Sequence, residues 1–316
     1  MNRLCIFAHW DRDQIIDDYV IYYLESLRKV CTKIIFVSDC NLPPEEKSKI
    51  EGIADCLICE HHGEYDFGSY KRGFLYAKNT ELNFDEIIFA NDSCYGPFYP
   101  LDRVLRKTEN KKCDWWGLTA NTYGLKKCGD KYVSCYDKHI QSYFFALRPQ
   151  VFKNPEFVNF ITSVKPLKTK DEIILNYEIG LTKLLDRMGF KKYICINCYT
   201  HTENCTAKKW DKLIIKKNYP FLKTSIPKNG LWVEGEVNWE SVITKYCDYP
   251  VELIKRNAQR LRNMQENLLE TMNPYRKIRY KILKNLPMEA RFIVIFLEKN
   301  IFNLLNAICL NKLKKF

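Results

Sequence analysis

Short apolar runs alternate with amphipathic stretches in the first 90 residues. Four runs are almost continuous in hydrophobic residues, which is typical of parallel strands buried on both faces: 3–8, 33–38, 56–59 and 86–90. After the first run, Asp13 is placed to cap a helix whose apolar residues recur at helical spacing: Ile16, Tyr19, Val20, Tyr23, Leu24 and Leu27. A second helix is predicted over 70–78. This alternation predicts an α/β fold, a mostly parallel sheet flanked by helices with right-handed crossovers.

The pattern changes after residue 110. Aromatic and apolar residues predict strands over 114–119 and 139–148, and the polar stretch 121–138 between them is expected to be a loop that covers a site. A helix is predicted from 171 to 188, ending at Gly189. Further elements are expected at 192–196 (strand) and 253–269 (helix).

Composition places the chain among globular proteins. It has 316 residues, 46% of them hydrophobic and 28% charged, which fits one large domain or two small ones. No opening segment has the layout of a signal peptide, and no run approaches the roughly 20 apolar residues of a spanning helix. We therefore expect a cytoplasmic protein. No glycine-rich dinucleotide or Walker motif is present.

Fourteen cysteines raise the question of a structural metal. The spacing of Cys195, Cys198, His201 and Cys205 resembles a zinc-ligand set, with Cys56 and Cys59 as a second pair. These cysteines interrupt apolar, strand-like runs, where residues three apart point to opposite faces. Reduced, buried cysteine is therefore the favoured interpretation over zinc.

The formal charge of +12 is concentrated near the end of the sequence. Residues 275–316 contain ten Lys or Arg and two Glu, a net charge of +8. Apolar segments alternate with these basic residues, which favours an interfacial helix on an anionic membrane surface over nucleic-acid binding. Packing of these residues on the rest of the protein is the equal alternative. We expect a catalytic domain over 1–230 and a helical, basic C-terminal extension over 231–316.

The fourth apolar run ends in Asn91, Asp92 and Ser93. In open α/β sheets, ligands bind outside the carboxyl ends of the strands. One carboxylate flanked by neutral oxygen ligands suits a hard cation that holds a diphosphate. An Asx-type turn followed by Gly96 and Pro97 is the simpler alternative.

Six motifs in this order carry a resemblance to a known family: Asp66-Phe-Gly-Ser-Tyr-Lys-Arg-Gly73, Asn91-Asp-Ser-x-Tyr-Gly-Pro97, Trp116-Gly-Leu-Thr119, His139-x-Gln-Ser-Tyr-Phe144, Tyr177-Glu-Ile-Gly-Leu181 and Tyr219-Pro-Phe-Leu-Lys223. Together they resemble the rhamnan synthesis F family over about residues 3–225. The resemblance implies a GT-A-like glycosyltransferase of bacterial surface-polysaccharide assembly. Its donor would be a nucleotide sugar such as dTDP-L-rhamnose, and its acceptor a glycan on a polyprenyl diphosphate at the inner face of the cell membrane.

The same resemblance implies donor-binding residues. Asn91, Asp92 and Ser93 occupy the place of an Asp-x-Asp motif, with Asp92 as a ligand of Mg²⁺ or Mn²⁺ or as a partner of donor hydroxyls without metal. Further donor contacts are expected from residues in two other segments: His9, Asp11, Asp66, Ser69, Lys71 and Arg72. His9 and Asp11 follow the first strand and are placed to meet the base or ribose, with ordinary loop polarity as the alternative. Lys71 and Arg72 are the candidates for the diphosphate, unless they are solvated helix charges.

Glu178 takes the position of the catalytic base in the helix of inverting GT-A enzymes, with Asp137 in reserve. A base that activates the acceptor hydroxyl is what a single displacement needs. The alternative for Glu178 is a helix-start acid favoured by the dipole. Acceptor contacts are expected from four residues: Trp116, His139, Gln141 and Lys223. The tryptophan is more often core, and His139 and Gln141 are also placed to contact donor hydroxyls. Lys223 is expected to neutralise phosphate, unless it is an exposed surface lysine. Asn91 in place of a carboxylate leaves a non-catalytic glycan-binding or scaffolding module open, and transfer of a different sugar remains open too.

Overall fold

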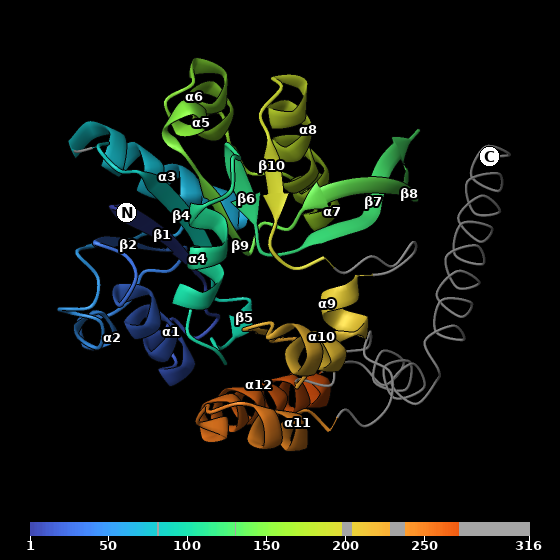
Figure 1. Cartoon of the computed structure of the whole chain (residues 1–316). Helices are drawn as coiled ribbons and strands as arrows, with labels where there is room; N and C mark the ends of the chain where they lie inside the picture. Colours follow the sequence, from blue (N-terminus) through green and yellow to red (C-terminus); the bar gives the residue numbers. More distant parts are fainter. Residues whose placement is uncertain (81, 130, 198–203, 228–237, 272–316) are drawn as a thin grey trace, which may run out of the picture. The chain divides into compact units, whose positions relative to one another are not determined.

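A seven-stranded, mostly parallel sheet forms the centre of the protein (Figure 1). The computed structural model describes residues 1–80, 82–129, 131–197, 204–227 and 238–271. Across the sheet the strands are β10 (Lys192–Ile194), β6 (Trp115–Gly117), β9 (Phe144–Leu147), β4 (Glu86–Asn91), β1 (Arg3–His9), β2 (Lys33–Ser38) and β3 (Cys56–Cys59). Strand β9 is antiparallel to both neighbours, and the remaining neighbours are parallel. The predicted mostly parallel α/β sheet is confirmed.

Helices cover both faces of this sheet. The helices of the described residues are α1 (Asp18–Arg28), α2 (Pro44–Ser48), α3 (Tyr65–Thr80), α4 (Asp102–Glu109), α5 (Pro149–Phe152), α6 (Pro155–Thr162), α7 (Lys170–Ile173), α8 (Gly180–Arg187), α9 (Cys205–Lys208), α10 (Trp210–Lys217), α11 (Trp239–Tyr246) and α12 (Val251–Thr271). A single stretch of π-helix, η1 (Ile174–Ile179), joins α7 to α8. Helix α1 begins after Asp17, so the predicted cap at Asp13 is wrong.

The central strands are apolar on both faces because both are covered. Leu4 and Ile6 of β1 belong to the same buried cluster as Phe74 of α3. Phe7, which alternates with them, meets Tyr23 of α1 with ring centroids 5.2 Å apart. Burial of such side chains contributes about 1.5–3 kcal/mol each, so the continuous apolar runs stabilise the sheet directly.

The segment from 120 to 147 differs from its prediction. The expected loop over 121–138 is a β-hairpin, β7 (Ala120–Cys128) and β8 (Lys131–Ile140). The single strand expected over 139–148 is split, because the chain leaves β8 at Ile140 and re-enters the central sheet only at Phe144. The break places Gln141, Ser142 and Tyr143 in a short connection at the end of the sheet where β1 and β4 finish.

A small antiparallel pair connects two distant parts of the chain. Strand β5 (Cys94–Tyr95) pairs with β11 (Leu222–Lys223). Gly96 has a φ of +128°, and a Cβ there would lie 2.3 Å from the carbonyl oxygen of Pro220. Glycine is therefore required for the close approach of these two segments.

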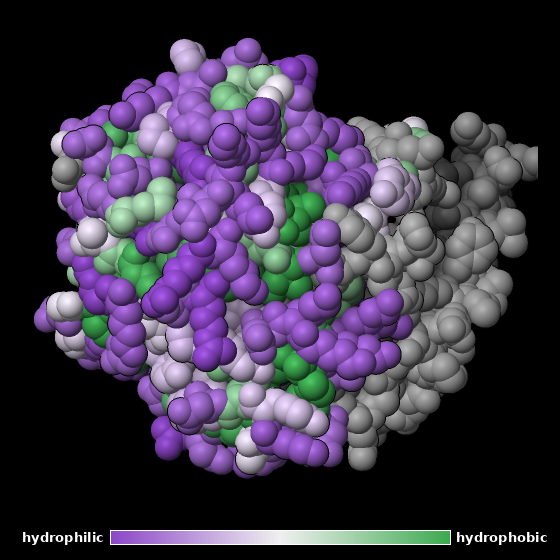
Figure 2. Space-filling model, viewed as in Figure 1, coloured by the Kyte–Doolittle hydropathy of each residue, from purple (hydrophilic) through white to green (hydrophobic). Residues whose placement is uncertain are grey.

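The described chain forms two compact units. The first comprises 1–224 and 240–254, so the segment 240–254, which the sequence placed in the extension, belongs with the main sheet. The described part of the second unit is 225–227, 238–239 and 255–271. The basic segment 275–316 lies outside the described residues. Of the helices the structure describes, none has the length and apolarity needed to cross a bilayer. The face seen in Figure 2 is mainly hydrophilic, with small separate hydrophobic patches.

Candidate active site

Polar side chains meet at the carboxyl ends of β1 and β4, beside the amino end of β9. Asp92 follows β4 directly and is half-buried. Its Oδ2 accepts the backbone N–H of Trp10, which follows β1, at 2.8 Å. Its carbonyl accepts the Tyr19 hydroxyl at 2.9 Å. Asp92 is therefore held at the edge of the sheet and not inside the hydrophobic core.

The amide side chain of Asn91 forms hydrogen bonds with a neighbouring carboxylate and a neighbouring hydroxyl. Its Nδ2 donates to Oδ2 of Asp66, from the first turn of α3, at 2.7 Å. Its Oδ1 accepts the hydroxyl of Ser93 at 2.6 Å. An aspartate at position 91 would place two negatively charged carboxylates in contact, whereas the amide can donate to Asp66 and accept from Ser93. Asp66 of α3 thus places a carboxylate directly beside residue 91.

Lys223 brings a positive charge to this cluster. Its Nζ lies 3.3 Å from the hydroxyl oxygen of Ser93 and 3.9 Å from the ring centroid of Tyr143. Burial raises the pKa of Asp66, while the Lys223 ammonium and the Asn91 amide lower it and offset part of that rise. The β5–β11 pair holds the lysine in this place, because Lys223 is opposite Cys94 in its register.

Glu178 lies on the π-helix and is held by the connection before β9. Its Oε1 lies 3.2 Å from Nε2 of His139, and its Oε2 accepts both the N–H and the hydroxyl of Ser142. Burial alone would raise the pKa of Glu178, but these hydrogen bonds and the His139 charge outweigh burial and lower it to about 2. Single-turn π-helices are frequent at functional sites.

Hydrogen bonds through Ser142 and Asn91 bring the carboxylates to the same end of the sheet. Tyr70 donates to the carbonyl of Ser142 at 2.8 Å, and the N–H of Ser142 donates to Glu178 at 3.0 Å. Asn91, which precedes Asp92, donates to Asp66 at 2.7 Å. The sheet edge therefore brings together three carboxylates, one lysine and one histidine that the sequence had singled out.

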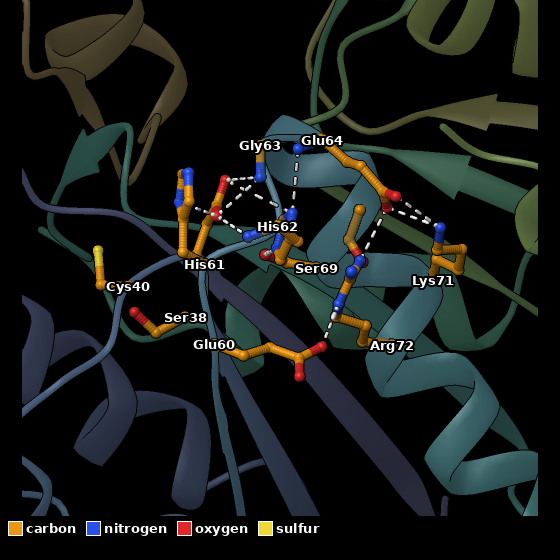
Figure 3. A network of polar contacts seen from close by, with 12 residues as sticks. Ser38, Cys40, Glu60, His61, His62, Gly63, Glu64, Ser69, Lys71 and Arg72 are labelled. Carbon is orange, nitrogen blue, oxygen red and sulfur yellow. Dashed lines mark hydrogen bonds and ion pairs between the residues drawn. The ribbon is translucent and has the colours of Figure 1, made fainter. Parts of the chain in front are cut away.

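A second polar network lies at the ends of β2 and β3, and Figure 3 shows it from close by. Asp39, which was not among the residues predicted from the sequence, accepts the backbone N–H groups of His62 and Gly63 at 2.5 and 3.0 Å. The ring of His62 accepts the N–H of Glu64 at Nδ1 and bonds the hydroxyl of Ser69 through Nε2, at 3.1 and 3.0 Å. Burial lowers the pKa of His62 to about 4. The position of Asp39, directly after an apolar strand, was the signal that would have found it.

The two cations expected at a diphosphate are engaged elsewhere in this structure. Lys71 contacts Glu64 at 2.7 Å and donates to the carbonyl of Val164 at 2.6 Å. Arg72 pairs with Glu60 at 2.6 Å and with Glu64 at 2.8 Å (Figure 3). These three ion pairs connect α3 to the loop that precedes it.

The remaining predicted residues have defined surroundings. His9 is buried and bonds Ser38 through Nδ1 at 2.8 Å, and the half-buried Asp11 accepts the N–H of Asp13 at 2.8 Å. Gln141 accepts the hydroxyl of Thr119 at 2.8 Å. Asp137, the reserve base, pairs with Lys183 at 2.5 Å.

Trp116 corrects the sequence-based expectation of an acceptor contact. The ring is fully buried, and its Nε1 donates to Glu86 at 2.7 Å. It therefore belongs to the core, the alternative that the sequence had left open.

Binding of a metal ion within the protein would require suitably arranged ligands among the described side chains. Among these residues, no group of three or more His, Cys, Asp and Glu is arranged to hold an ion. Mg²⁺ is commonly bound by one or two carboxylates together with substrate phosphates, and Asp92 provides one such carboxylate. Of the suggested zinc set, Cys198 and His201 lie outside the described residues. Cys205 is disulfide-bonded, which corrects the expectation of a reduced thiol at that position.

Comparison with known proteins decides the family. The family model described as rhamnan synthesis protein F matches residues 34–307. The chain belongs to the rhamnan synthesis protein F family. A curated relative, the uncharacterized protein y4gN of Sinorhizobium fredii (strain NBRC 101917 / NGR234), is 23% identical over 167 residues. The match covers 53% of this family member and 42% of the relative, so the chain spans less than half of the relative's length.

Two solved structures show a distant similarity to this family member. The inositol-1-phosphate CTP transferase from T. maritima is 12% identical with a TM-score of 0.38, over 61% of this chain and 84% of that chain. Residues 1–349 of TarS from S. aureus are 10% identical with a TM-score of 0.39, over 68% and 63% of the two chains. Similarities of this size carry no conclusion about function.

Proposed function

We propose that this protein is a GT-A-like glycosyltransferase that moves a deoxyhexose such as rhamnose from a nucleotide sugar to a growing glycan. The observation that carries the proposal is the cluster of Asp66, Asp92 and Glu178 with Lys223 at the carboxyl end of the central strands. Family membership supports a role in polysaccharide synthesis. The acceptor proposed is a glycan on a polyprenyl diphosphate, at the inner face of the cell membrane.

Each residue is assigned a part in a single displacement with inversion. Lys223 stabilises the negative charge that develops on the departing nucleoside diphosphate. Asp92 binds the donor, directly or through Mg²⁺ or Mn²⁺. Glu178 removes the proton of the acceptor hydroxyl, while the acceptor oxygen bonds the anomeric carbon and the bond to the diphosphate breaks.

A donor assay with a matched variant tests the proposal. Purified protein is incubated with a panel of nucleotide sugars that includes dTDP-L-rhamnose, with a synthetic lipid-diphosphate-linked rhamnose oligosaccharide, and with Mg²⁺, Mn²⁺ or EDTA. We expect transfer from one donor. Asp92→Asn keeps an oxygen for the Trp10 N–H, so its melting temperature should stay near wild type while transfer falls at least about 100-fold. Wild-type turnover by this variant would reject the role of Asp92.

The same assay separates the enzyme from a non-catalytic glycan-binding module. The feature that favoured such a module was Asn91 in place of a carboxylate, and Asp66 supplies a carboxylate 2.7 Å from that amide. Binding of the oligosaccharide without transfer or hydrolysis of any donor would favour the module.

A further inference from the structure

The contacts of His139 define where its protons lie. Its Nδ1 is 2.8 Å from the carbonyl oxygen of Asp137, which can only accept, so Nδ1 carries a proton. Its Nε2 faces Oε1 of Glu178 at 3.2 Å. With a proton on Nε2 as well, the ring is an imidazolium paired with a carboxylate. Burial lowers the pKa of His139, but the Glu178 carboxylate outweighs burial and raises it above the ordinary histidine value.

In that ion-paired form Glu178 is a poor base. Both of its oxygens already accept hydrogen bonds, and its pKa is about 2, far below the pH at which a proton acceptor works best. Loss of the Nε2 proton changes this. The pair then carries one negative charge, and a proton that reaches Glu178 can be shared with the free Nε2 lone pair.

Glu178 and His139 differ in their exposure to solvent. The side chain of Glu178 is 20% exposed and that of His139 only 1%. An acceptor hydroxyl can therefore meet Glu178 but not the imidazole. Other charged groups lie near the pair. Asp137 and Lys138 of β8 flank His139 in sequence, and Lys183 of α8 pairs with Asp137. Asp66 of α3 interacts electrostatically with Glu178, and Lys170 of α7 interacts with Asp66. Asp137 is itself paired with Lys183, so Glu178 is the carboxylate in direct contact with the ring.

We propose that His139 is a positioning residue that receives, through Glu178, the proton of the acceptor hydroxyl, and that transfer requires the form of the pair without a proton on Nε2. This inference rests on the proposed glycosyl transfer. In the step, the acceptor O–H bond breaks and its proton passes to Glu178 and is shared with Nε2. The acceptor oxygen bonds the anomeric carbon, and the electrons of the breaking bond leave with the diphosphate.

A titration of the full-length protein tests the pair without any assay of transfer. The ¹³Cε1–¹H signal of His139 is identified by its loss in His139→Gln. We expect it to titrate above the ordinary histidine value in wild type, and Glu178→Gln to lower that midpoint by about one unit or more. A midpoint at or below the ordinary value, or one that Glu178→Gln leaves in place, would overturn the proposal.

A pH–rate profile then tests the mechanism, with dTDP-L-rhamnose and the synthetic oligosaccharide as probes. Wild-type kcat should rise with pH through the midpoint seen by NMR. His139→Gln keeps a donor for Glu178 but cannot titrate, so it should lose that limb and about 100-fold in kcat, with KM for the donor within twofold. The control is His61→Gln, an exposed histidine on Asp39. A retained limb in His139→Gln overturns the inference alone, whereas absence of transfer from every donor by wild type overturns the proposed function.

Discussion

Single residues of the candidate site were predictable where a polar side chain directly follows a predicted strand. Asp92 and Glu178 were identified from their places after a strand and in a helix motif, and Asp66 through the family resemblance. The partners of these residues were not predictable. Asn91 contacts Asp66 across 25 positions, and Glu178 contacts His139 across 39, so only the folded chain shows which amide serves which carboxylate.

Lys223 offers a first prediction at this scale. Lys223→Met removes the ammonium beside Ser93 and keeps the aliphatic stem. We expect KM for the nucleotide sugar to rise about 10- to 100-fold, since a hydrogen bond to a charged group contributes about 1.5–3 kcal/mol. Steady-state kinetics measure this. Lys216→Met, on the exposed end of α10, is the control and should leave KM unchanged.

The pair of His139 and Glu178 also predicts a pH window for stability. A lowered pKa of Glu178 stabilises the fold above the ordinary carboxyl value of 4.5 and loses that effect as the pH falls toward about 2. A raised pKa of His139 stabilises the fold below the ordinary value of 6.5 and loses that effect as the pH rises through the folded value. The deficit of Glu178→Gln in urea unfolding should therefore be largest between about pH 4.5 and 6.5. An equal deficit at pH 8.5 would contradict the ion pair.

At the scale of elements, long apolar runs were read correctly and irregular ones were not. The strands at 3–9, 33–38 and 86–91 match their predictions because each is buried on both faces, and the half-buried edge strand at 56–59 matches as well. Helix α3 begins at Tyr65, five residues before its predicted start. No sequence pattern marks this start, because Tyr65 takes a φ of +56° and the loop before it is held by hydrogen bonds to the buried Asp39.

Two glycines on helices give a matched test of packing. A Cβ on Gly73 of α3 would lie 2.4 Å from Cγ2 of Ile6, so Gly73→Ala should destabilise the protein by about 1–3 kcal/mol. A Cβ on Gly180 meets nothing closer than 3.5 Å, so Gly180→Ala should be neutral or stabilise by about 0.4–1 kcal/mol. Chemical denaturation measures both changes. Equal changes in stability for the two variants would show that close packing of Gly73 against Ile6 does not restrict the size of the side chain at position 73.

On the scale of the whole molecule, the α/β class followed from hydrophobic pattern alone, whereas the division of the chain did not. The segment 240–254 joins the first unit through contacts such as those of Tyr249 with Tyr22 and Phe98, whose ring centroids are 4.9 and 5.0 Å away. Such aromatic contacts between residues far apart in sequence leave no periodic signal. The domain boundary expected at 230 stays a prediction.

Membrane association is a prediction for the entire chain. Residues 275–316 carry a net charge of +8, and each basic residue near an anionic surface contributes about 1 kcal/mol. Full-length protein should sediment with phosphatidylglycerol vesicles at low salt and much less with neutral vesicles. Deletion of 275–316 should abolish sedimentation, provided that the truncated protein keeps its melting temperature. Unchanged binding by a folded truncation would refute the role of this segment.

The pairing of β5 with β11 has a consequence for a chain still being made. Ser93 and Lys223 are separated by 130 positions, yet they meet at 3.3 Å. A ribosome that has released Asp92 must add all of the intervening residues before the lysine can arrive. A nascent polypeptide shorter than 223 residues thus lacks the ammonium beside Ser93, and premature termination before residue 223 yields a sheet whose carboxylates have no lysine from β11 next to them.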